Sequence, residues 1–177
     1  MVPLNQNNQC DEVQERRIQS HPVVKLSSVI DEALIVCDMK ARTKLEAIEE
    51  LSSLVAAKRR LGKEFIIESV LARERVCTTA IGRRSAFPHA RLAGLKQIIV
   101  ALGISKAGVD FDSLDGAPVN FIVLILTAET ASSDYLGTLA AFAALSRDPQ
   151  KMAMILSAES AADLLATIQN FGMTIES

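Results

Sequence analysis

One stretch of the sequence combines a histidine with several arginines: Ala80-Ile81-Gly82-Arg83-Arg84-Ser85-Ala86-Phe87-Pro88-His89-Ala90-Arg91. His89 is one of only two histidines in the 177 residues, and three arginines lie within six residues of it. A neutral imidazole nitrogen is a nucleophile near neutral pH, and guanidinium groups bind phosphate oxygens in pairs. These residue types are what a site for a phosphoryl group, or for another dianion, would need.

Pro88 gives the histidine a defined direction at the end of a short apolar run. Proline restricts its own φ and favours extended backbone at the preceding Phe87. An imidazole with an ordinary pKa of about 6.5 is largely neutral in the cytoplasm and can attack phosphorus without a separate base. Phosphoryl transfer then asks the protein for positioning and for cations around the moving oxygens. The candidate cations are Arg73, Arg83, Arg84 and Arg91, and the sequence alone leaves open which of them face His89.

The alternative interpretation is a surface turn with a solvated histidine and scattered arginines, because structural charge clusters can mimic functional sites. Cys77, close to this stretch, is expected to be a small buried residue rather than a second phosphoryl acceptor. The other histidine, His21, precedes a proline in a polar region and is expected to be a solvated loop residue.

Composition and motifs exclude several classes of function. A formal net charge of −2, one tyrosine and no tryptophan argue against nucleic-acid binding. The three cysteines have no metal-ligand spacing, and no phosphate-binding loop, GxGxxG or GxSxG motif occurs, so neither a metal nor a cofactor is expected. No apolar run approaches the roughly 18 residues of a membrane span, so we expect no membrane insertion and a cytoplasmic location.

Apolar periodicity predicts helices alternating with strands along the chain. Strands are expected at 34–37, 78–81, 85–87, 97–104 and 119–127, the last buried on both faces, with a loop at 106–118. Helices are expected at 27–33, from the Thr43-Lys44-Leu45-Glu46 capping box to Gly62, at 64–75, after Ser132 or Ser133, after Asp148-Pro149, and from Ser160.

These elements predict the domain organisation. Residues 1–23 are rich in amides and charges and are expected to be a flexible polar leader. Residues 24–177 are expected to form a single α/β layered domain with helices on both faces of a sheet.

The motif around His89 resembles the active-site signature of fructose/mannitol-type enzyme IIA of the bacterial phosphoenolpyruvate-dependent sugar phosphotransferase system, including nitrogen-regulatory IIA proteins. The resemblance extends from about residue 25 to 168. Its signature is carried by Thr79-Ala80-Ile81-Gly82 and Ala86-Phe87-Pro88-His89-Ala90-Arg91. Further along, the similarity continues through the segment 108–119, the strand 121–127, the helix 134–145 and Arg147-Asp148-Pro149.

The resemblance implies a mixed β-sheet flanked by helices and a phosphocarrier activity. His89 would accept a phosphoryl group from a histidine phosphocarrier protein, and in transport members a cysteine on a IIB domain would receive it. The family's helper arginine falls on Arg73, and its second histidine is replaced by Tyr135, whose hydroxyl can still donate a hydrogen bond to phosphate. Arg83 and Arg84 stand where many members have Asn-Gly or a similar small polar pair, and would add positive charge that binds phosphate.

Three functions remain to be distinguished. The first is a phosphocarrier that passes the group on or uses it as a signal. The second is a regulatory module that docks on a kinase, transporter or transcription regulator without productive transfer. The third is an anion-binding protein that uses the arginines and Tyr135 without any transfer. The sequence leaves open whether the chain forms a homo-oligomer.

Overall fold

A computed structural model describes residues 26–129 and 133–171, and the predicted leader at 1–23 and His21 lie outside the described residues. In chain order the elements are α2 (Leu26–Val29), β1 (Ile30–Val36), α3 (Lys44–Arg59), α4 (Lys63–Glu74), β2 (Ala80–Gly82), β3 (Ser85–Ala86), β4 (His89–Leu92), β5 (Ile99–Val109), β6 (Val119–Ala128), α5 (Ser133–Ser146), α6 (Pro149–Leu156) and α7 (Ala161–Asn170).

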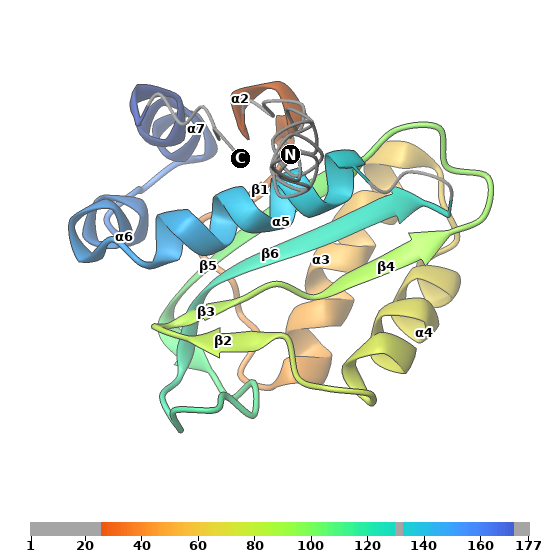
Figure 1. The fold of residues 1–177 in the computed structure, drawn as a ribbon, viewed down its shortest axis with the longest axis horizontal. Helices are drawn as coiled ribbons and strands as arrows, with labels where there is room; N and C mark the ends of the chain where they lie inside the picture. The colour runs from red at the N-terminus through yellow and green to blue at the C-terminus, as the bar shows by residue number, and fades with distance from the viewer. Residues whose placement is uncertain (1–25, 130–132, 172–177) are drawn as a thin grey trace, which may run out of the picture.

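Within the described residues, six strands form one mixed sheet in the order β1-β5-β6-β3-β2, and β4 pairs with β6. β1 is parallel to β5, and β3 and β4 are parallel to β6, whereas β5–β6 and β2–β3 are antiparallel. β3 and β4 follow each other along the same side of β6, which is the central strand (Figure 1).

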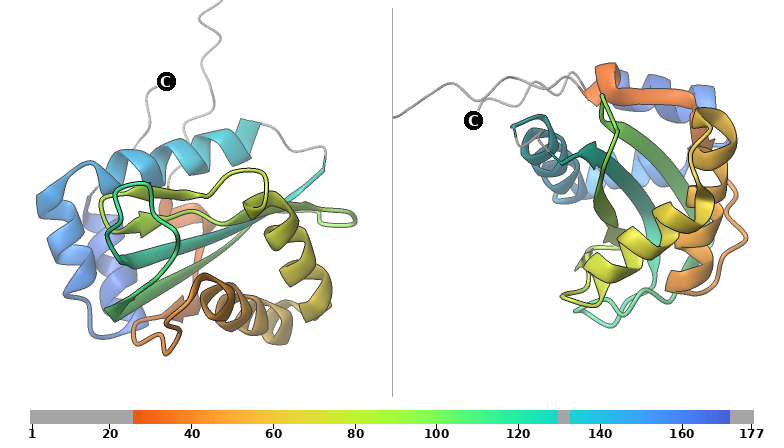
Figure 2. Two further views of the ribbon diagram at one scale, coloured as in Figure 1. Left: turned by 90° about the horizontal axis from the view of Figure 1, so that it is seen from below. Right: turned by 90° about the vertical axis from the view of Figure 1, so that its right-hand side faces the viewer.

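Helices cover both faces of the sheet, as Figures 1 and 2 show. Buried side chains of α3 and α4 pack on one face, and those of α2, α5, α6 and α7 pack on the other. β6 is buried at every position except its last, because its side chains alternate between these two cores. The predicted fold class and the buried strand at 119–127 are therefore confirmed.

The helix starts follow the capping signals in the sequence. Thr43 Oγ1 accepts a hydrogen bond from the Glu46 amide, and Glu46 Oε2 accepts one from the Thr43 amide, so the predicted capping box is present. Asp148 caps α6 and Ser160 caps α7. The predicted cap at Ser132 lies outside the described residues.

Two predicted elements are wrong at their boundaries. Residues 30–33 were expected to be helical, but α2 ends at Val29 and β1 begins at Ile30, because pairing with β5 outweighs the local helix signal. Residues 106–109 were expected in a loop, but β5 continues to Val109, which pairs with Val119 after a register shift. Gly108, at φ +83°, lets the strand bulge and continue.

We predict that Gly108→Ala destabilises the fold more than the matched substitution Gly94→Ala. Both glycines have φ +83°, so each alanine costs about 1 kcal/mol of backbone strain. A Cβ on Gly94 meets no atom within 4 Å, whereas one on Gly108 would lie 2.7 Å from Pro118 Cβ. Overpacking should bring the total loss at Gly108 to about 2–4 kcal/mol. Urea unfolding measures both losses, and equal values would contradict the steric argument.

Candidate functional site

His89 is the first residue of β4 and pairs with Ile125 of β6. Because side chains alternate along a strand, His89 and Arg91 share the face that carries α5, while Ala90 and Leu92 face the core under α4. The imidazole is half-buried and the Arg91 side chain is exposed. The strand thus places a ring and a cation two residues apart on the same side of the sheet.

The backbone before His89 is fixed on both of its sides. The Phe87 amide donates a hydrogen bond to the Thr79 carbonyl at 3.1 Å, and the Pro88 carbonyl accepts one from the Ile125 amide at 2.9 Å. This extended segment connects β3 to β4, and its Phe87 carbonyl points toward the ring of His89, two residues later. His89 Nδ1 lies 2.9 Å from that oxygen.

Arg73, at the end of α4, reaches the other ring nitrogen. Its Nε lies 3.0 Å from His89 Nε2, and its Nη1 donates to the Cys77 carbonyl at 3.0 Å. The neighbouring Glu74 is buried and accepts hydrogen bonds from the amide and the hydroxyl of Thr79. The helix end and the start of β2 are therefore tied together, and the guanidinium is held against the imidazole.

The two hydrogen bonds determine the tautomer of His89. A guanidinium group has no acceptor atom, so Nε2 must accept the hydrogen bond that Arg73 donates. A carbonyl has no donor, so Nδ1 must carry the ring proton and donate a hydrogen bond to the Phe87 carbonyl. The ring is neutral, and its lone pair is on Nε2. This nitrogen is the nucleophile that the site offers.

The surroundings of His89 favour the neutral ring. Burial lowers the pKa of His89 most, and the positive charges of Arg73 and Arg91 lower it further. The Phe87 carbonyl and the Glu74 carboxylate act in the opposite direction without cancelling the shift. A lowered pKa means that a larger share of the molecules has a free lone pair at any pH near neutrality.

Tyr135, in the first turns of α5, lies beside the histidine. Its ring centroid is 5.4 Å from that of His89, and the Arg91 guanidinium lies 5.9 Å from its centroid. Burial raises the pKa of Tyr135, while Arg73 and Arg91 act to lower it. The phenol therefore keeps its proton and is available as a hydrogen-bond donor.

The structure brings four of the six predicted site residues together: His89, Arg73, Arg91 and Tyr135. It places Arg83 and Arg84 elsewhere, in the turn between β2 and β3. There the Arg84 Nε donates to Asn120 Oδ1 at 2.7 Å, and the Arg83 amide donates to Asp115 Oδ2 at 3.0 Å. The turn flanks the pairing of Ser85 with Phe121, which lies four residues along β6 from the pairing of His89 with Ile125.

Sequence reasoning did not find every residue that shapes the site. Glu74 carries a charge next to Arg73 in the sequence, but only the folded helix end shows that it fixes Thr79. The Phe87 carbonyl is a backbone atom, which no side-chain pattern reports. The prediction that Cys77 is buried is wrong: its side chain is exposed, and its carbonyl holds Arg73.

Other kinds of site are not evident in residues 26–129 and 133–171. These residues contain no group of three or more His, Cys, Asp and Glu side chains that could hold a metal ion. No helix among them has the length and apolar character needed to cross a bilayer.

Comparison with known families shows which family the chain belongs to. The family model described as phosphoenolpyruvate-dependent sugar phosphotransferase system, EIIA 2, matches residues 28–171. The chain belongs to this family. EIIA domains are the histidine phosphocarriers of the sugar phosphotransferase system, so the chain is a member of a family of phosphotransferases.

Relatives of two kinds match this EIIA chain. Nitrogen regulatory proteins from Bradyrhizobium diazoefficiens and Pseudomonas aeruginosa are each 32% identical to it, over 70% of this chain and 80% of theirs. The fructose-specific EIIABC component of Bacillus subtilis is 29% identical over 77% of this chain, but that match covers only 22% of the larger protein.

Solved structures show the same EIIA fold. The crystal structure of the nitrogen regulatory protein IIA-Ntr from Neisseria meningitidis superposes with a TM-score of 0.76 at 29% identity, covering 81% of this chain and 98% of that one. Enzyme IIAMTL from Escherichia coli, solved in complex with phosphorylated enzyme IIBMTL, gives a TM-score of 0.66 at 17% identity, covering 80% of this chain and 97% of that one.

We predict that Arg73→Gln raises the pKa of His89 toward its ordinary value, because the substitution removes a cation that favours the neutral ring. Arg75→Gln is the matched control: it lies two residues further on, and its side chain is exposed. An NMR titration of the imidazole measures both pKa values. Nitrogen chemical shifts should also show the proton on Nδ1 in the parent. A proton on Nε2, or an equal shift in the two variants, would contradict the geometry.

Proposed function

We propose that His89 Nε2 is the phosphoryl acceptor of this EIIA chain, with a phosphohistidine carrier protein as donor. The observation that carries the proposal is the pair of hydrogen bonds that leaves the lone pair on Nε2 and the proton on Nδ1. Nε2 is also the nitrogen beside which the Arg73 guanidinium lies, and it needs no base to become a nucleophile.

The transfer step balances without any further reagent. The Nε2 lone pair forms the new N–P bond while the N–P bond of the donor breaks, and that electron pair returns to the donor nitrogen. The ring keeps its Nδ1 proton, and the Phe87 carbonyl stabilises the positive charge that the phosphorylated imidazole acquires. The Arg73 guanidinium gives up its hydrogen bond to Nε2 as the phosphorus approaches, and its N–H groups then donate to the phosphoryl oxygens.

Two cations and one hydroxyl are available to the phosphoryl oxygens. Arg73 is positioned by the Cys77 carbonyl, and Arg91 extends from the same strand face as His89. Preorganised donors of this kind stabilise charge as it develops, because they need little rearrangement during the step. Tyr135, beside the ring, supplies a hydroxyl donor where the family's second histidine would stand.

We favour a regulatory use of the phosphoryl group, because two nitrogen regulatory proteins are each 32% identical to this chain. Sugar transport is the alternative, since the fructose-specific EIIA component of Haloferax volcanii is 30% identical and is covered for 90% of its length. A IIB domain, as in the solved mannitol complex, is the alternative receiver. Both roles belong in the cytoplasm, where phosphoenolpyruvate is made.

The other alternative is a docking module without transfer. Its partner would bind with the same affinity whether or not His89 carries a phosphoryl group. The oligomeric state is a separate measurement.

We predict that incubation with phosphoenolpyruvate, enzyme I and a histidine phosphocarrier protein attaches an acid-labile phosphate to the parent chain. His89→Ala should remain unlabelled. Arg73→Gln should be labelled about 10²- to 10³-fold more slowly, because a preorganised donor is lost, while Arg75→Gln should match the parent. The measurement is the rate of label uptake by each of the four proteins. Labelling of His89→Ala at the parent rate would show that another residue is the acceptor.

A second prediction concerns the phenol. Tyr135→Phe keeps the ring that packs beside His89 and removes only the hydroxyl. If the hydroxyl donates to the phosphoryl group, loss of that hydrogen bond should speed release of phosphate from the phosphorylated chain by about five- to tenfold. The half-life of the isolated phosphoprotein is the measurement, with the melting temperature as a check on packing. An unchanged half-life would assign Tyr135 a packing role alone.

A further inference from the structure

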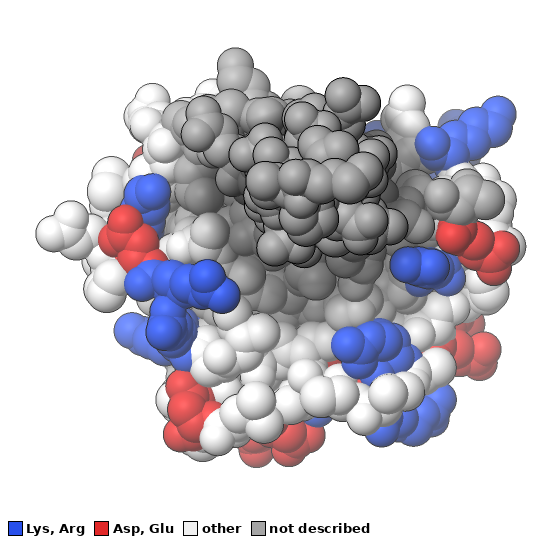
Figure 3. Space-filling model, viewed as in Figure 1, with Lys and Arg blue, Asp and Glu red and all other residues white. Residues whose placement is uncertain are grey.

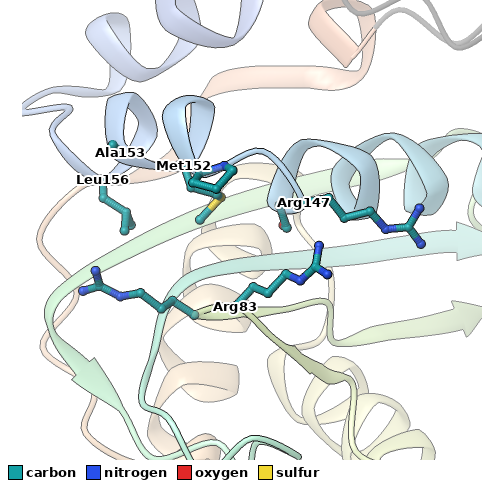
Figure 4. A pocket seen from close by; sticks show the side chains of 8 residues that line it. Arg83, Arg147, Met152, Ala153 and Leu156 are labelled. Carbon is teal, nitrogen blue, oxygen red and sulfur yellow. The ribbon is translucent and has the colours of Figure 1, made fainter.

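Arg83 and Arg84 line a groove on the side of the molecule away from β4. The groove has a volume of about 540 Å³ and lies between the β2–β3 turn and the segment that joins α5 to α6. In Figure 3, basic side chains lie on the α6 side of the molecule, with acidic side chains beside them. In Figure 4, Arg83 lies on one side of the groove, and Arg147 and Met152 lie on the other.

Within the described residues, the arginine side chains that line the groove form no ion pair. Its described lining comprises three arginines, one serine and apolar residues, with no carboxylate. Neither the Arg83 nor the Arg147 side chain has an ion-pair partner within the described part of the chain. The carboxylates nearby are engaged in local structure: Asp115 accepts from Ser113 and from backbone amides, and Asp148 caps α6.

Arg84 is held in place by a buried amide. Its Nε donates to Asn120 Oδ1 at 2.7 Å, and Asn120, which is 3% exposed, donates in turn to the Ser105 carbonyl at 2.7 Å. The Arg84 nitrogens beyond Nε have no partner in the described residues. A guanidinium fixed through one nitrogen keeps its remaining donors oriented for a ligand, with little loss of side-chain entropy on binding.

The backbone of the turn is an unfavourable place for two arginines. Arg83 has φ +54° and Arg84 has φ +63°, the conformation that a two-residue hairpin turn requires and that Asn-Gly adopts at low cost. Side chains with a Cβ are strained there. The local fold therefore does not explain why both positions carry arginine, whereas a ligand for the groove would.

We propose that this groove binds a small organic phosphate ester. Each guanidinium group carries a positive charge and paired N–H donors, which suit a phosphate dianion. Met152, Ala153 and Leu156 give the opposite wall an apolar surface for the organic part of the ester. The volume is within the range of small-molecule pockets, so a compact ligand fits the hollow better than an extended acidic segment of a protein. The site is independent of phosphoryl transfer at His89.

The test is a titration of the full chain with phenyl phosphate, followed by amide NMR. We expect saturable shifts at Arg83, Arg84 and Arg147, separate from any shifts at Ala90 and Arg91 that report binding at His89. Arg147→Gln and Arg83→Gln should each weaken the groove affinity about tenfold. Arg42→Gln, an exposed arginine outside the groove, is the control and should leave it unchanged.

Several outcomes would overturn the proposal. One is the absence of saturable shifts at the groove amides up to about 10 mM phenyl phosphate, since weaker binding would have no specificity. Another is an equal loss of affinity in Arg42→Gln, which would indicate non-specific attraction. Saturation by a tetraglutamate peptide but not by phenyl phosphate would assign the groove to an acidic protein segment. Melting curves of the variants, expected to match the parent, show that each one is folded.

Discussion

The hydrogen bond between His89 Nδ1 and the Phe87 carbonyl is the constraint on which the site depends. It links a ring nitrogen to a carbonyl two residues earlier, which requires the extended backbone that Pro88 enforces. That backbone is fixed in turn by Thr79 on one side and by Ile125 on the other. The central strand therefore determines the protonation of an imidazole at the edge of the sheet, although none of its own side chains takes part in the chemistry.

In the proposed transfer, the same two cations would act on the ring before and after phosphorylation. In the free protein, burial lowers the pKa of His89 most, and the charges of Arg73 and Arg91 lower it further, so that they favour the neutral ring. Once a phosphoryl group is attached, these charges become favourable, because two negative charges then stand where one lone pair was.

Much of this could be predicted from the sequence, because local signals act over a few residues. The caps at Thr43, Asp148 and Ser160, the buried strand β6, and the histidine motif all depend on neighbours in the chain. Pairing across the sheet could not be predicted in the same way. Ile30 belongs to β1 because it pairs with β5, and no helix-capping signal in the sequence predicts that pairing.

The site shows the same division between local and long-range information. Arg73 could be proposed as a partner of His89 because a family motif marks it, but the position of Arg83 and Arg84 depends on where a tight turn meets Asn120, 36 residues further on. Residue type indicated that these arginines could bind an anion. Only the folded sheet shows that they lie apart from the histidine, beside Arg147 and α6.

The carbonyl that holds Nδ1 has a consequence for the covalent product. An imidazole can be modified at either nitrogen, and the two phosphohistidine isomers differ in their resistance to hydrolysis and in how other proteins recognise them. With Nδ1 engaged by the backbone, the proposed phosphorylation would take place at Nε2. A receiving protein would then meet a single phosphohistidine isomer.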